Sequence, residues 1–160
     1  MFKHFLLIVF CALCFVGCKG DPETQELTSY VTSDLYNIRT HLRAATHQYE
    51  SSLSKNEKAR ADIIRTKVVT QYQKYLDGLR AIKTDTVLVD SLNQTGVQAV
   101  ERAIDDLEKY RKIALRGNTH QTMRARSDAE TAMENVQRWQ KEVWESAHAR
   151  GISVPEDIHR

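Results

Sequence analysis

The chain has 160 residues, with 23 lysines and arginines against 21 aspartates and glutamates, and its formal net charge is +2. So balanced a charge creates no global attraction to nucleic acid, and we expect no nucleic-acid partner. Only two prolines occur, Pro22 and Pro155, and the stretch between them has only three isolated glycines before Gly151. Because proline costs a helix interior about 3 kcal/mol and glycine about 1 kcal/mol, this composition predicts long helices.

The first nineteen residues have the pattern of an export signal. A short start containing Lys3 precedes an uncharged apolar run from Phe5 to Val16. This run is shorter than the roughly 20 residues that a helix needs to cross a bilayer, and it has the size of the apolar region of a signal peptide. All three cysteines of the chain, Cys11, Cys14 and Cys18, lie in or directly after it.

The sequence Phe15-Val16-Gly17-Cys18 resembles the lipobox of bacterial lipoprotein precursors. The resemblance ends at Lys19 and departs from the family pattern at Phe15, where leucine is usual. It implies that residues 1–17 are cleaved and that Cys18 carries a diacylglyceryl group and an amino-terminal acyl chain such as palmitate. The alternative is a plain signal peptide with a free cysteine near the start of the mature protein.

The lipoprotein resemblance also implies a location in the cell envelope. Several acyl chains hold a protein firmly on a membrane, so the membrane is an expected partner through Cys18. Aspartate after the cysteine is associated with inner-membrane retention, and this chain has Lys19 there. The resemblance therefore favours the outer membrane in an organism that has one. The lack of cysteine after Cys18 fits an oxidising compartment, where a spare thiol risks mispairing.

Four apolar stripes follow at the helical spacing of three and four residues. They span 27–53, 61–82, 89–114 and 123–147. Ser54 and Glu57 have the spacing of a capping box at the start of the second helix. Residues 84–86 break the pattern, Gly117-Asn118 ends the third helix and caps the fourth, and 93–96 is a poor helical stretch where a kink is expected.

These stripes predict an all-α fold, an up-down-up-down four-helix bundle of long antiparallel helices. Each segment would be about 40 to 48 Å long, and links of a few residues force neighbours to run antiparallel. Each helix has one apolar face and one charged face, so each needs the others to bury its stripe. The alternative is a three-helix bundle in which the first two segments are fused. We expect a tether at 18–25, the bundle at 26–150 and a tail at 151–160, with Ile152 and Val154 either mobile or folded back.

A search for chemistry finds little. Glu145 and His148 match one copy of the Glu-x-x-His pattern of di-iron bundles, which need two copies and two further glutamates. No nucleotide-binding loop or nucleophile motif occurs. We therefore expect no enzyme activity, no catalytic residues, no metal and no cofactor. The tyrosines and Trp139 are expected in the core, and Trp144 on its flank.

A basic run between the third and fourth helices is the remaining candidate site. It has six cations and no acid between positions 109 and 126, namely Lys109, Arg111, Lys112, Arg116, Arg124 and Arg126. The helix dipole favours cations at the end of the third helix but not at the start of the fourth, where Arg124 and Arg126 lie. The bland interpretation is a solvated surface, and the functional one is a basic tip that binds an anionic partner.

Three functions remain at this stage. The first is a membrane-anchored interaction or scaffold module that binds an envelope protein or an anionic surface through residues 109–126. The second is a chaperone-like or ligand-binding bundle, which requires an accessible groove or cavity. An envelope enzyme or metal protein is the third and least favoured. Self-association remains open as well, because long heptad-like stripes can form coiled coils with a second copy.

Overall fold

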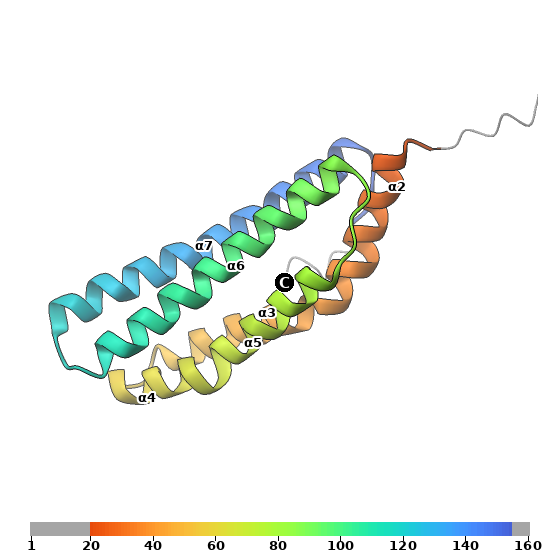
Figure 1. The fold of residues 1–160 in the computed structure, drawn as a ribbon. Helices are drawn as coiled ribbons and strands as arrows, with labels where there is room; N and C mark the ends of the chain where they lie inside the picture. Colours follow the sequence, from red (N-terminus) through yellow and green to blue (C-terminus); the bar gives the residue numbers. More distant parts are fainter. Residues whose placement is uncertain (1–19, 155–160) are drawn as a thin grey trace, which may run out of the picture.

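The computed structural model describes residues 20–154, and within this range the only regular secondary structure is helical (Figure 1). Residues 1–19, which include the predicted signal segment and Cys18, and residues 155–160 lie outside the described residues. The helices form four long segments. The first consists of α2 (Pro22–Ser29), η1 (Tyr30–Asp34) and α3 (Leu35–Ser52), the second of α4 (Glu57–Ile63), η2 (Ile64–Val68) and α5 (Val69–Ala81), and the last two are α6 (Val87–Ala114) and α7 (Thr119–Ala149).

The first segment starts earlier than the sequence analysis expected. The Asp21 carboxylate accepts a hydrogen bond from the Thr24 backbone amide at 3.3 Å, and Pro22 occupies the first turn, where its missing amide costs nothing. Residues 22–25, expected in the tether, therefore belong to the helix. η1 and η2 are single π-helical turns, one in each of the first two segments.

The second segment is separate from the first, because the helix stops at Ser52 and restarts at Glu57. The predicted capping box at Ser54 and Glu57 is wrong. Asn56 is the cap, and its side-chain oxygen accepts the Ala59 amide at 2.9 Å, while the Ser54 hydroxyl donates to the Ser51 carbonyl. Asn56 directly precedes the first turn and so reaches its free amides, as an N-cap must.

The third segment begins where the sequence indicated. Thr86 caps α6 by accepting the Val89 amide at 3.4 Å, and the Glu26 carboxylate accepts the amides of Asp85 and Thr86. Burial raises the pKa of Glu26, but these hydrogen bonds outweigh it, so that the pKa lies below its ordinary value. The glutamate thereby ties the start of α6 to the first segment.

Residues 93–96 continue the helix, since α6 runs from Val87 to Ala114. Asn93 is buried, donates to the Leu79 carbonyl at 3.1 Å and accepts the Tyr30 hydroxyl at 3.3 Å. Gly96 lies directly against the Trp139 ring. Asn93 and Gly96 are weak helix formers, and each makes a contact with another helix.

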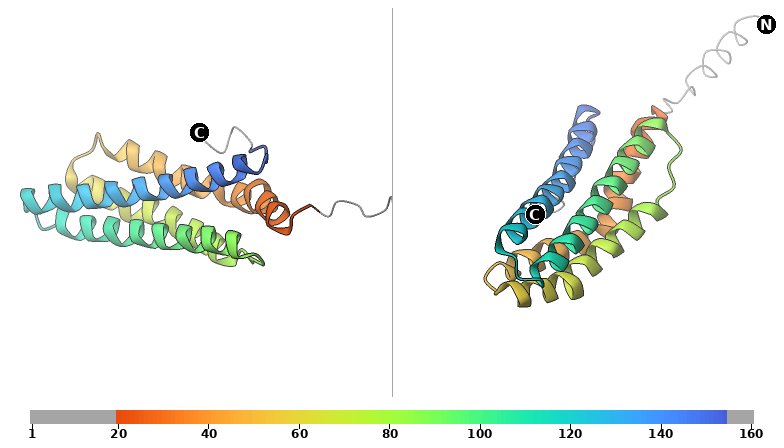
Figure 2. Two further views of the ribbon diagram at one scale, coloured as in Figure 1. Left: turned by 90° about the horizontal axis from the view of Figure 1, so that it is seen from above. Right: turned by 60° about the vertical axis from the view of Figure 1, so that its left-hand side comes forward.

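α6 and α7 lie side by side along their length, while α3 packs on α5, and α5 packs on α6 (Figure 2). The core between them includes five of the six tyrosines and Trp139, which is 1% exposed, and this confirms their predicted burial. Tyr36 is only partly buried at the edge of the core, so its predicted place there is wrong. Met123 is 68% exposed, so its predicted place on the apolar stripe is wrong. At the start of α7 the small residues Thr122, Ala125 and Ala129 are buried instead.

Among the described residues, no helix is both long enough and apolar enough to cross a bilayer.

Candidate functional site

The predicted basic run lies at the turn between α6 and α7, which is at the opposite end of the molecule from the start of α2 (Figure 1). Gly117 adopts φ +77°, which favours glycine, and Asn118 accepts the Gln121 amide at 3.0 Å to cap α7. The predicted roles of these two residues are confirmed. The turn thereby brings the basic end of α6 and the basic start of α7 together.

Three of the six cations are paired with acids. Lys109 contacts Asp128 at 3.3 Å across the two helices, Arg111 contacts Glu108 at 2.7 Å, and Arg126 contacts Glu130 at 3.0 Å. These acids lie just outside the window 109–126, which is why the run looked free of acid in the sequence. Glu130 also accepts the Tyr49 hydroxyl at 2.9 Å. The hydrogen bond to Glu130 raises the pKa of Arg126, so the arginine stays charged and paired with that carboxylate.

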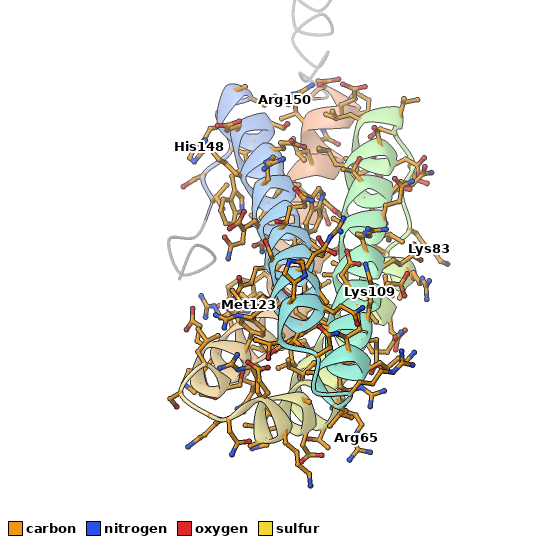
Figure 3. All side chains as sticks on the ribbon, turned by 90° about the vertical axis from the view of Figure 1, so that its left-hand side faces the viewer. Arg65, Lys83, Lys109, Met123, His148 and Arg150 are labelled. Carbon is orange, nitrogen blue, oxygen red and sulfur yellow. The ribbon has the colours of Figure 1, made fainter. Side chains whose placement is uncertain are left out.

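The other three cations, Lys112, Arg116 and Arg124, are exposed and have no ion pair within residues 20–154. Two large apolar side chains are exposed among them, Leu115 at 54% and Met123 at 68%. We call these five residues the distal tip. Figure 3 shows Met123 and Lys109 on the half of the bundle away from Arg150 and His148. Two exposed apolar side chains and three unpaired cations near the same turn form a surface suited to an anionic, partly apolar partner.

A buried arginine forms hydrogen bonds with the link between α3 and α4 at the same end of the molecule. Arg60 of α4 is 5% exposed, and its five N–H donors match five acceptors. They are the carbonyls of Ser52, Leu53 and Lys55, the Glu57 carboxylate and the Tyr110 hydroxyl, at 2.7 to 3.3 Å. Arg60 thereby satisfies carbonyls left free at the end of α3. Through Tyr110 it joins the 53–56 link to α6.

A second candidate is a groove of about 610 Å³ between α3 and α7. α7 is tied to the first segment at both ends, by the Arg150–Glu23 ion pair at 3.5 Å and the Tyr49–Glu130 hydrogen bond. Between these ties the groove opens. Its floor is apolar, with Leu42, Tyr72, Met133 and Val136 buried or nearly so, and Trp144 is half-buried in its wall.

The polar wall of this groove is basic over most of its length. It is formed by Arg39, Arg43 and His47 of α3, followed by Glu50, and the α7 wall adds Gln137 and Gln140. The Arg39 guanidinium stacks on the Tyr36 ring with its carbon 3.2 Å from the ring centre. The Arg43 Nε is buried and has no hydrogen-bond partner among residues 20–154.

The sequence analysis did not identify the groove residues. Arg39, Arg43 and His47 recur every four positions beside an apolar stripe, and such spacing places them on one helix edge. That pattern was the available signal. It could not show that α3 and α7 separate there, because the separation depends on the arrangement of all four segments.

The predicted metal-ligand pattern and the predicted lipidation site have the following places in the structure. Within residues 20–154, no group of three histidine, cysteine, aspartate or glutamate side chains is placed to hold a metal ion. Glu145 and His148 are both exposed near the end of α7. Cys18 lies outside the described residues, so its predicted lipidation stays a prediction.

No protein-family model, no curated protein and no solved structure matches this chain.

Proposed function

We propose that this protein is a lipid-anchored interaction module of the bacterial cell envelope, whose distal tip binds an acidic protein partner. The observation that carries the proposal is that three unpaired cations and the exposed Leu115 and Met123 lie near the turn between α6 and α7. Cations that have no partner within a chain keep their full charge for an external one, and the apolar pair supplies area that water disfavours.

The orientation follows from the proposed anchor. With Cys18 lipidated, α2 starts within a few residues of the membrane. In an up-down-up-down bundle, the links at 53–56 and 115–118 then lie away from the lipid. The helices α6 and α7 have 28 and 31 residues. At 1.5 Å per residue, the distal tip would stand about 40 Å above the membrane surface. A rod of this length presents its tip beyond the lipid headgroups.

Photo-crosslinking in cells tests the proposal. With the photo-reactive p-benzoylphenylalanine in place of Arg116, we expect a discrete protein adduct, identified by mass spectrometry. Reversing two neighbouring charges, Lys112→Glu with Arg124→Glu, should lower its yield about tenfold, which corresponds to about 1.4 kcal/mol.

The matched control is Lys83→Glu with Lys74→Glu, a reversal of two exposed lysines away from the distal tip, which should leave the yield unchanged. Equal losses in both double variants would point to a general charge effect. Adducts to lipid alone, or none above background, would contradict the protein partner.

The groove supports a second candidate, a ligand-binding bundle. Its apolar floor and basic wall suit an elongated ligand with an acidic end, and binding would quench or shift the fluorescence of Trp144. Binding of such a ligand in the groove would favour this second candidate.

A further inference from the structure

The floor of the groove between α3 and α7 contains a tyrosine hydroxyl without a partner. The hydroxyls of Tyr30, Tyr49 and Tyr110 all form hydrogen bonds with other side chains. Tyr72 is 1% exposed and lines the groove, but its hydroxyl forms no hydrogen bond within residues 20–154. This oxygen is not fully enclosed, so its remaining surface opens to the groove. An acceptor bound there would replace the water that folding removes from the hydroxyl.

An unpaired cation lies on the wall of the same groove. Arg43 is half-buried and has no ion pair or hydrogen bond within residues 20–154. Its Nε is buried, whereas the two terminal nitrogens of the guanidinium, which also lack a partner, keep accessible surface. His47, four residues further along α3, is exposed on this wall and is unpaired within the same residues. The accessible end of Arg43 is therefore able to bind an anion from the groove.

Tyr72 and Arg43 lie at nearly the same level of the groove. The His41 ring and the Gln71 side chain are hydrogen-bonded at 2.9 Å, which aligns these two positions of α3 and α5. Tyr72 directly follows Gln71, and Arg43 is two residues beyond His41. The two residues are therefore within about 5 Å of one another along the helix axes. Both long side chains line the groove, so one small acceptor group between them is within reach of both.

The groove continues from this level to Trp144. The ties between α7 and the first segment show that α3 and α7 run in opposite directions. Arg43 is six residues before Tyr49, and Val136 is six residues after Glu130, the partner of Tyr49, so Arg43 lies near the level of Val136. From there to Trp144 is about 12 Å along α7. An extended chain of about ten carbons has this length, because each C–C bond of about 1.5 Å advances it by about 1.3 Å.

The charges along the groove favour Arg43 as the site of a carboxylate. Glu50 lines the groove beyond it, and a carboxylate at that end would meet a like charge. In the direction of Trp144 the next cation is Arg39, which donates to the Tyr36 carbonyl and stacks on the Tyr36 ring. Arg39 therefore already has partners for its guanidinium, whereas Arg43 has none within residues 20–154.

We propose that the groove between α3 and α7 binds a medium-chain fatty acid, a linear carboxylate of about eight to twelve carbons. Its carboxylate accepts hydrogen bonds from the terminal nitrogens of Arg43 and from the Tyr72 hydroxyl. Its chain covers the apolar floor and ends beside Trp144. This inference rests on the second candidate function, the ligand-binding bundle, and it does not depend on the distal tip.

Calorimetric titration of the full chain with decanoate tests the carboxylate. We expect saturable binding at one site, and about tenfold weaker binding of decan-1-ol, which has the same chain without the charge. Arg43→Gln should weaken decanoate binding about tenfold and Tyr72→Phe about fivefold, while both variants bind decan-1-ol as the native chain does. Tyr72→Phe keeps the ring and its packing, so it decides the question if the Arg43→Gln chain fails to fold.

Brominated acids test the orientation of the chain, because bromine quenches indole fluorescence only at close range. The bromine lies at the far end of 10-bromodecanoate and beside the carboxylate in 2-bromodecanoate. We expect 10-bromodecanoate to quench the fluorescence more strongly. The difference should vanish in Trp144→Phe, in which the buried Trp139 is the remaining tryptophan.

Arg138→Gln is the matched control, because Arg138 is exposed on α7 outside the groove, and its decanoate affinity should be unchanged. Equal affinity for decanoate and decan-1-ol, native affinity in the Arg43 and Tyr72 variants, or stronger quenching by 2-bromodecanoate would overturn the inference. The groove would then remain a site for other apolar ligands. Binding of neither probe, or a stable dimer that excludes both, would contradict the ligand-binding candidate itself.

Discussion

Gly96 of α6 lies against the ring of Trp139 of α7, and its lack of a side chain lets the two helices approach closely at this point. A Cβ atom at Gly96 would lie 2.3 Å from the Trp139 ring, and the indole N–H donates to the Leu92 carbonyl at 2.7 Å. The ring therefore cannot slide away without losing its hydrogen bond. The glycine is retained although alanine is intrinsically the better helix former by about 1 kcal/mol.

We predict that Gly96→Ala destabilises the protein by about 2 kcal/mol, because overpacking and the strained hydrogen bond outweigh the gain in helix propensity. Urea unfolding followed by circular dichroism measures the change. In a Trp139→Phe chain the smaller ring leaves room, and Gly96→Ala should cost clearly less there. Greater stability of Gly96→Ala in the native background would show that the contact does not constrain the helices.

At the scale of elements, Arg60 decides how the first two segments meet. Its five donors close the 53–56 link, and its bond to Tyr110 reaches a residue 50 positions away. The sequence placed this link correctly from the end of an apolar stripe, although it assigned the cap to Ser54 and not to Asn56. It could not show which polar side chain would satisfy the carbonyls, because Tyr110 comes from a helix that the local pattern does not locate.

We predict that Arg60→Lys destabilises the protein by about 2 to 3 kcal/mol, because an ammonium has three donors and cannot span five acceptors. Hydrogen exchange should also accelerate in the first turn of α4. Arg65→Lys is the control on the same segment, since Arg65 has one exposed ion pair with Asp62, and it should cost less than about 0.5 kcal/mol. Similar losses in the two variants would contradict the special role of Arg60.

At the scale of the whole molecule, local sequence patterns predict the helices but not how the helices are arranged. Four segments, their order and the buried aromatic residues follow from apolar periodicity and caps, since these are local. The groove and the pairing of Lys109 with Asp128 follow from how whole helices lie relative to one another. Arg43 illustrates the difference. Its spacing of four residues from Arg39 and His47 places it beside the apolar stripe of α3, but it lines a groove only because α3 and α7 are separated there.

The bundle as a whole should be sensitive to alkali. Burial is the main cause that raises the pKa values of Tyr30, Tyr49, Tyr72, Tyr75 and Tyr110, and it raises that of Tyr110 to about 12. Tyrosine in an unfolded chain has a pKa near 10. Below pH 10 both states are protonated and stability is complete. Above it the unfolded state loses protons first, so stability falls by up to about 1.4 kcal/mol per pH unit for each tyrosine.

With five such residues the loss reaches roughly 7 kcal/mol per pH unit, comparable to the whole stability of an ordinary domain. We therefore predict cooperative unfolding between about pH 10.5 and 12, in which tyrosinate absorbance at 295 nm rises together with the loss of helical circular dichroism. Tyr75→Phe removes one of these groups, so its alkaline transition should move to higher pH relative to its own stability at pH 7. Ionisation of the buried tyrosines near pH 10 with full helicity retained would mean that their hydroxyls are open to water, and that the core is looser than these contacts require.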